Sequence, residues 1–132
     1  MMRLLQWIYK KRQAFLWATI ILLLFITLLP GDKIPMMPNW KSLLQPDKII
    51  HLVSFAGLQF ILLLNIRKYT YWKNILISIF IGLFFGVATE VLQGILPINR
   101  TMTIYDMIAN AAGILLGFLF WRATAKKIET VE

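Results

Sequence analysis

The chain contains no cysteine, which excludes disulfide bonds, a thiol nucleophile and a thiolate metal site. Charged residues are also few: they make up 15% of the 132 residues, whereas hydrophobic residues make up 59%. Soluble domains contain about 25% charged and about 45–50% apolar residues. The composition therefore predicts an integral membrane protein, and the length leaves room for a single domain, residues 1–132.

Acidic residues are the scarcer charge, with 6 Asp and Glu against 14 Lys and Arg, so the net charge is +8. In a soluble protein this excess would suggest nucleic acid as a partner. Here the basic residues cluster at the ends of apolar segments, where they orient a membrane protein and contact anionic lipid. We therefore expect membrane lipids, and not nucleic acid, as partners.

Long apolar segments dominate the rest of the sequence. Four of them, at about residues 13–29, 48–66, 75–96 and 104–121, approach the roughly 17–25 residues of a spanning helix. Lipid offers no partner for backbone polar groups, so helices are expected, and the alternation of barrel strands is absent. No Ala-x-Ala-like cleavage site follows the first segment, so we interpret it as a span and not a signal peptide. The prediction is an all-α bundle of four transmembrane helices.

Basic residues are unevenly distributed between the two ends of these segments. Ten Lys and Arg flank the side that holds both termini and residues 67–74, and four flank the other side. The positive-inside rule then predicts that this multi-pass protein has both termini in the cytoplasm. The interfaces suit the tryptophans Trp7, Trp40, Trp72 and Trp121.

Ionisable residues lie inside three of the apolar segments, at His51, Glu90 and Asp106. An Asp or a basic residue costs roughly 2.5–3.5 kcal/mol at the centre of a spanning helix, so such residues indicate a polar site. Helical spacings of three or four place further polar residues on the same faces. We expect a cup open to the outside, lined by Asp47, His51, Glu90, Gln93, Arg100, Asp106 and Asn110.

Two GxxxG patterns, Gly82 to Gly86 and Gly113 to Gly117, share helix faces with the polar residues of the third and fourth segments. Small residues let helix backbones approach closely in lipid. We expect these two helices to pack on each other through glycine on the inner side and through polar residues on the outer side. Either glycine face is also a candidate contact in a homo-oligomer.

Each polar residue also has a purely structural interpretation. Glu90 and Arg100 could form an ion pair at the membrane boundary, and Asp47 could cap a helix. Asn110 could hydrogen-bond a neighbouring helix, and a lone His51 is more often a satisfied polar residue than a ligand. Gln59 and Asn65 lie elsewhere on the second segment, and we assign them packing or interfacial roles.

Two stretches, PDKIIHLVSFAGL and EVLQGILPINRTMTIYDMIANAAGILLG, carry a family resemblance. Over residues 46–117 the chain resembles the VanZ-like family, small bacterial membrane proteins named for a member linked to teicoplanin resistance. The family pattern falls on Asp47, Lys48, His51, Phe55, Glu90, Gln93, Arg100, Asp106, Asn110, Gly113 and Gly117. Where the family often has serine, this chain has Thr101 and Thr103. The resemblance implies an integral membrane protein that acts at the outer face of the bacterial cytoplasmic membrane.

The first functional hypothesis is a binding or modulating protein without cofactors. Its cup would hold the head group of an anionic lipid, a lipid-linked wall precursor or a lipoglycopeptide antibiotic. Arg100, with Lys48 nearby, would bind phosphate or carboxylate. Gln93 and Asn110 would hydrogen-bond sugar or peptide.

Two alternatives remain open. The second hypothesis is a small membrane hydrolase or transferase, with His51 as base or nucleophile oriented by Asp47. Glu90 or Asp106 would act as acid or base, and Arg100 would stabilise charge on phosphate. In a variant of this hypothesis, His51, Glu90 and Asp106 hold magnesium, manganese or zinc. The third is an assembly factor whose polar residues serve only helix packing.

Overall fold

The computed structural model describes residues 2–33, 45–66, 70–98 and 103–129, so Trp40 and Arg100 lie outside the described residues. Its helices are α1 (Met2–Lys10), α2 (Arg12–Thr27), α3 (Pro46–Asn65), α4 (Tyr71–Ile95) and α5 (Ile104–Glu129), with a short 3-10 helix, η1 (Gly31–Lys33). The all-α prediction is confirmed for the described residues, and helices α2 to α5 correspond to the four apolar segments. Helix α1 is an addition that the sequence analysis did not predict.

Three helices are long and apolar enough to cross a membrane: α3, α4 and residues 104–124 of α5. Helix α2 is shorter, with 16 residues, which corresponds to about 24 Å at 1.5 Å per residue. The hydrocarbon core of a bilayer is about 30 Å thick. The chain is therefore a multi-pass membrane protein with three or four spans.

Local sequence explains where the spanning helices begin and end. Helix α3 starts at Pro46, a residue that fits the first helical position because it needs no intrahelical N–H donor. The N-cap residue of α3 is Gln45, and Asp47 lies inside the first turn, where its charge complements the helix dipole. Helix α4 ends at Ile95, shortly before Pro97, which cannot continue a helix.

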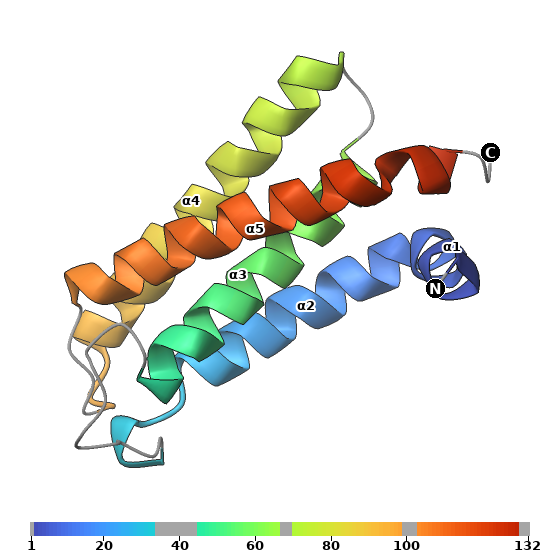
Figure 1. Cartoon of the computed structure of the whole chain (residues 1–132). Coiled ribbons are helices and arrows are strands. Elements are labelled where there is room, and N and C mark those ends of the chain that lie inside the picture. The colour runs from blue at the N-terminus through green and yellow to red at the C-terminus, as the bar shows by residue number, and fades with distance from the viewer. Residues whose placement is uncertain (1, 34–44, 67–69, 99–102, 130–132) are drawn as a thin grey trace.

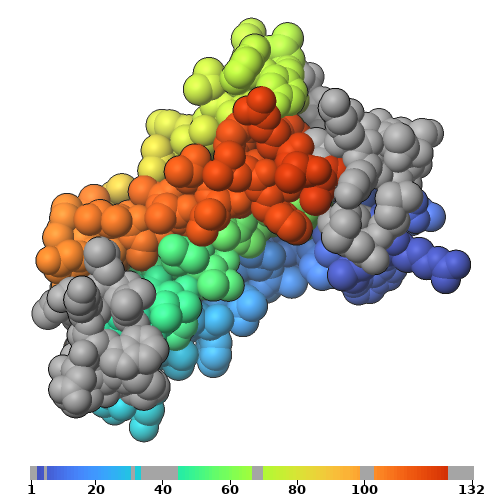
Figure 2. All heavy atoms as spheres, in the orientation of Figure 1, coloured from blue at the N-terminus to red at the C-terminus, as the bar shows by residue number. Residues whose placement is uncertain are grey.

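Helix α3 is the centre of the bundle and contacts α2, α4 and α5. Figure 2 shows it between α5 and α2 on one face of the molecule. Its side chains Phe55, Leu58 and Leu62 form a buried core with Leu23 of α2 and Ile114 of α5. Helix α1 and the end of α5 lie together at one end of the bundle, while α4 diverges from α5 toward its own start (Figure 1).

The glycines of α5 face α3, not α4 as the sequence analysis expected. A Cβ atom added at Gly113 would meet the carbonyl oxygen of Leu52, and one added at Gly117 would meet that of Ala56. The small side chain of Ala56 leaves the α3 backbone accessible at this contact. Glycine therefore permits a close approach of the α3 and α5 backbones.

The glycines of α4 face side chains rather than another backbone. A Cβ added at Gly82 would lie 3.0 Å from Gln59 Oε1 and 3.2 Å from Ile114 Cδ1. One added at Gly86 would lie 3.6 Å from Asn110 Nδ2. The two glycine faces thus do not meet each other, because α5 is turned so that its glycines lie against α3.

Candidate functional site

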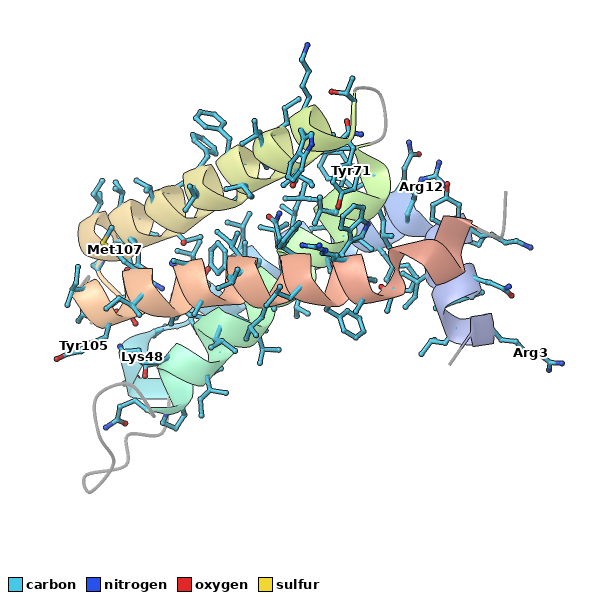
Figure 3. All side chains as sticks on the ribbon, turned by 45° about the horizontal axis from the view of Figure 1, so that its top comes forward. Arg3, Arg12, Lys48, Tyr71, Tyr105 and Met107 are labelled. Carbon is cyan, nitrogen blue, oxygen red and sulfur yellow. The ribbon has the colours of Figure 1, made fainter. Side chains whose placement is uncertain are left out.

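Polar side chains gather at one end of the bundle, opposite helix α1. Figure 3 shows Lys48 and Tyr105 at this end and Arg3 and Arg12 at the other. Helices α3 and α5 begin at this end and α4 finishes there, so their polar turns come together. The buried polar residues of this end include Lys48, His51, Glu90, Gln93, Asp106 and Asn110.

The first group, here called the lysine cluster, consists of Asp47, Lys48, Thr103 and Asp106. Lys48 Nζ lies 2.6 Å from Asp47 Oδ2 and 2.6 Å from Asp106 Oδ1. The Thr103 hydroxyl donates to Asp106 Oδ2 over 2.6 Å, and the Asp106 N–H reaches back to Thr103 Oγ1 over 3.3 Å. Lys48 is thus held between two carboxylates from two helices.

The second group, here called the histidine cluster, lies one helical turn deeper and consists of His51, Glu90 and Asn110. His51 Nδ1 is 2.8 Å from Asn110 Oδ1, and Asn110 Nδ2 donates to Glu90 Oε1 over 3.1 Å. His51 Nδ1 is also 3.7 Å from Glu90 Oε1. All three side chains are buried, with His51 0% exposed. One side chain from each of three helices therefore meets at a single point.

The bonds of Asn110 determine how the His51 ring is protonated. An ionised Glu90 carboxylate only accepts hydrogen bonds, so the amide NH₂ of Asn110 must face it. The amide oxygen then faces His51 Nδ1, which must carry a proton to donate to it. In the neutral ring this leaves the lone pair on Nε2. The Asn110 contact thus holds the His51 ring in one orientation.

The structure separates several residues that the sequence analysis grouped together. Asp47 pairs with Lys48, and His51 Nδ1 is positioned by Asn110 instead of Asp47. Gln93 Nε2 donates to the carbonyl oxygen of Thr27, so it links α4 to α2. Its contact with sugar or peptide stays a prediction.

The predicted metal ligands also fall into different clusters. Asp106 belongs to the lysine cluster, whereas His51 and Glu90 belong to the histidine cluster. Within the described ranges of the chain, no three His, Asp or Glu side chains gather in a metal-binding arrangement. The geometry thus gives no support to the variant in which His51, Glu90 and Asp106 share a metal ion.

Most of the described residues that were predicted to line the cup are buried, while Asp47 is partly exposed; the buried ones are His51, Glu90, Gln93, Asp106 and Asn110. A small hollow of about 50 Å³ does approach them from between α4 and α5. Its wall is apolar except for Asn110, and it is lined by Leu83, Gly86, Val87, Met107, Asn110, Ala111 and Ile114. Most of these residues are exposed, so the hollow opens on the side of the bundle, with Asn110 of the histidine cluster in its wall.

Two other polar contacts were not found from the sequence. Thr103 caps α5 through the Thr-x-x-Asp spacing, a signal that resembles a capping box and could have been recognised. Deeper in the bundle, Gln59 Nε2 donates to Ser78 Oγ over 2.9 Å, and the Ser78 hydroxyl donates to the Ile75 carbonyl over 2.8 Å. This second pair joins α3 to α4 away from the two clusters.

Comparison with known families agrees with the resemblance carried by residues 46–117. A family model described as VanZ/LLP1 matches residues 4–125, which includes helix α2 as well as the motif region. No curated protein and no solved structure is significantly similar to the chain. The family match covers most of the sequence, and the chain therefore belongs to the VanZ/LLP1 family.

Proposed function

We propose that the protein binds the head group of a cell-envelope amphiphile at the polar end of the bundle. The candidates are an envelope lipid, a lipid-linked wall precursor and a lipoglycopeptide antibiotic of the teicoplanin type. The observation that carries this proposal is the meeting of His51, Asn110 and Glu90 from three helices within an apolar bundle. Buried ionisable groups are costly in a membrane, and such groups commonly mark functional sites.

The charges of the two clusters favour a ligand that donates hydrogen bonds and disfavour a simple anion. Asp47, Glu90 and Asp106 supply three carboxyl groups, while Lys48 is already engaged by two of them. A head group with hydroxyl, amide or ammonium donors would replace contacts within the clusters. A phosphate would depend on Arg100, which lies outside the described residues.

The hollow between α4 and α5 supports a ligand with a hydrocarbon tail. It is open to the lipid-facing surface, and Asn110 forms part of its wall. Its volume of about 50 Å³ admits a short length of chain but no head group. A ligand with its hydrocarbon tail in this hollow and its head group at the clusters would be an amphiphile.

Native mass spectrometry of the detergent-purified protein tests the proposal. We expect a specific lipid mass on the wild-type protein that is lost from folded Asp106→Asn and Asn110→Ala variants. Ser78→Ala is the matched control, because it removes a buried hydrogen bond to Gln59 away from the clusters. Loss of the mass from Ser78→Ala as well, or a bare protein throughout, would contradict the proposal.

A hydrolase or transferase is the second candidate function, and the contact of His51 with Asn110 and Glu90 favours it. In such an enzyme His51 would act as a general base or as a nucleophile. Turnover of the bound amphiphile by the wild-type protein, abolished in His51→Gln, would support it. Full turnover by Glu90→Gln would exclude acid–base catalysis by that residue.

We also propose that the polar end faces the outside of the bacterial cytoplasmic membrane. The support is the excess of Lys and Arg at the end of the bundle that holds α1 and the C-terminal end of α5. In this orientation the clusters would contact the outer leaflet, where lipid-linked wall precursors and lipoglycopeptides meet.

An assembly role without a ligand remains the third hypothesis, and it predicts that cluster variants lose folded yield and activity together.

A further inference from the structure

Helix α1 lies across the end of the bundle opposite the polar clusters. The chain turns at Lys11, so α1 does not continue along the axis of α2 (Figure 1). Asn65 at the end of α3 helps to fix this turn, because its Nδ2 donates to the Arg12 carbonyl over 3.1 Å. The Arg12 guanidinium lies 4.5 Å from the centre of the Tyr9 ring and donates to the Tyr9 carbonyl over 3.2 Å. The direction of α1 is thus defined by contacts from two other helices.

The sequence of α1 is amphipathic. Its polar residues Arg3, Gln6 and Lys10 are spaced by three and four, which places them on one face of the helix. The remaining residues of α1 are apolar, and Leu4 and Trp7 are exposed at 58% and 54%. A helix with a basic face and exposed apolar side chains is typical of one that lies in a membrane interface.

Aromatic contacts place α1 at the level of one interface. The buried Tyr9 ring packs in a cluster with Ile61, Leu64 and Trp121. Trp121 in turn lies 5.8 Å from Tyr71, measured between ring centroids. Tryptophan and tyrosine concentrate at the membrane–water interface. Helix α1 therefore packs at the depth of an aromatic belt.

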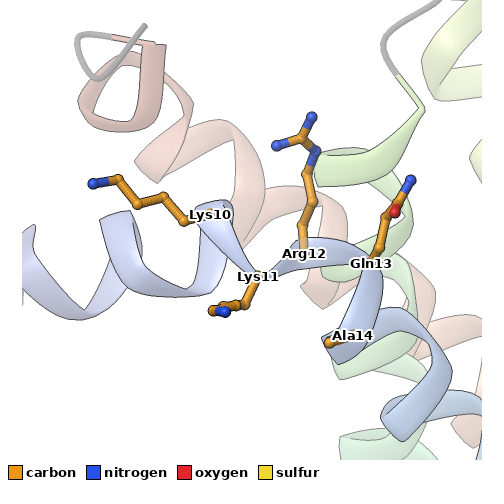
Figure 4. Close-up of a pocket in the computed structure, with 5 residues that line it drawn as sticks. All are labelled: Lys10, Lys11, Arg12, Gln13 and Ala14. Atoms are coloured by element: carbon orange, nitrogen blue, oxygen red, sulfur yellow. The ribbon is translucent and has the colours of Figure 1, made fainter.

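The cations beside α1 have few acids to neutralise them. No Asp or Glu occurs before Asp32 in the sequence. Lys10 and Lys11 are exposed, and neither forms an ion pair within the described part of the chain. Together with residues 12–14, they line an open hollow of about 410 Å³ at the turn, and Figure 4 shows these five side chains. The hollow is open to the surface, so a phospholipid head group can reach the two exposed lysines.

We propose that α1 lies in the plane of the membrane interface and that Lys10 and Lys11 bind the head group of an anionic phospholipid. The apolar side chains of α1 would enter the lipid, while the lysines reach the phosphate level. Near an anionic surface each lysine strengthens lipid binding by about fivefold. This inference does not depend on the function proposed for the polar clusters, since it concerns the opposite end of the protein.

The first test measures lipid binding to the full chain in detergent by native mass spectrometry with phosphatidylglycerol. Lys10→Gln and Lys11→Gln should each raise the apparent Kd by about fivefold. Lys33→Gln is the control, because Lys33 is exposed and lies in η1 at the opposite end. Equal affinity for phosphatidylcholine, or an unchanged Kd in both variants, would overturn the proposal. Equally strong binding of inorganic phosphate would also overturn it, since that would indicate a free-anion site.

The second test measures the depth of α1 in a bilayer. Because the chain has no cysteine, Leu4→Cys and Gln6→Cys each provide a unique position for a spin label. In bilayers containing phosphatidylglycerol, the Leu4 label should be accessible to oxygen and the Gln6 label to a water-soluble nickel chelate. Accessibility of both labels to the nickel chelate would show that α1 leaves the membrane, and would overturn the proposal.

Discussion

Asn110 Oδ1 lies 2.8 Å from His51 Nδ1, and the same amide donates to Glu90 through Nδ2. One asparagine thus couples the single histidine of the chain to a buried carboxylate on another helix. With Glu90 ionised, the arrangement sets the orientation of the amide and favours a proton on His51 Nδ1. Most of what we propose for the polar end depends on this contact.

Replacing Asn110 with alanine should remove the preference of the His51 proton for Nδ1 over Nε2. In the wild-type protein the neutral imidazole should carry its proton on Nδ1, whereas Asn110→Ala should give a mixture of both tautomers. Because the chain has one histidine, nitrogen-15 NMR of histidine-labelled protein reports this ring alone. A wild-type ring protonated on Nε2 would contradict the hydrogen bonding described here.

Replacing Lys48 with methionine should destabilise the protein strongly. The change leaves the Asp106 carboxylate buried and without its lysine, and breaking a buried ion pair costs about 3–5 kcal/mol. The double variant Lys48→Met/Asp106→Asn should regain a large part of this loss, since the charge is removed as well. Unfolding of both variants in a denaturing detergent measures the effect. Strictly additive losses would show that Lys48 and Asp106 are not coupled.

Alanine at Gly113 or Gly117 should push α5 away from α3. The added methyl group would overlap the carbonyl oxygen of Leu52 or Ala56, and overpacking of this kind costs about 1–3 kcal/mol. Gly57→Ala and Gly94→Ala are matched controls, because nothing lies within 4 Å of their added Cβ atoms. The controls should be neutral or slightly stabilised, since alanine favours a helix more than glycine does. Equal effects at all four positions would argue against the close packing of α3 and α5.

Single cysteines should reveal which end of the bundle faces outward. In intact cells, a membrane-impermeant maleimide should label Lys33→Cys in η1 and leave Arg122→Cys in α5 unlabelled. Both positions are exposed, so access to the reagent depends on the side of the membrane. The reverse labelling pattern would invert the proposed orientation and place the polar clusters in the cytoplasmic half.

The spanning segments could be predicted from the sequence, but their exact ends could not. Helix α4 begins at Tyr71, ahead of the predicted residue 75, and α5 continues to Glu129, past residue 121. Hydropathy detects only the part of a helix that suits hydrocarbon, whereas a helix continues into the interface wherever its backbone bonds are satisfied. Helix α1 escaped prediction because its nine residues are too few to span a membrane.

The pairing of polar residues was harder to predict than their presence. Spacing along each helix correctly grouped Glu90, Asp106 and Asn110 toward one end of the bundle. It could not set the rotation of one helix against another, so Asp47 was expected to orient His51, a contact that Asn110 makes instead. That rotation depends on the close approach of α3 and α5 at Gly113, a tertiary contact without a local signal.

The most direct test of the account measures the His51 ring while a ligand binds. Nitrogen-15 NMR of the delipidated protein should show a change in the Nε2 resonance when a bacterial envelope lipid extract is added, and separately when teicoplanin is added. We predict that at least one of them shifts this resonance in the wild-type protein and in Ser78→Ala, but not in Asp106→Asn. Binding detected by mass that leaves both His51 nitrogens unchanged would contradict a ligand site at the polar clusters.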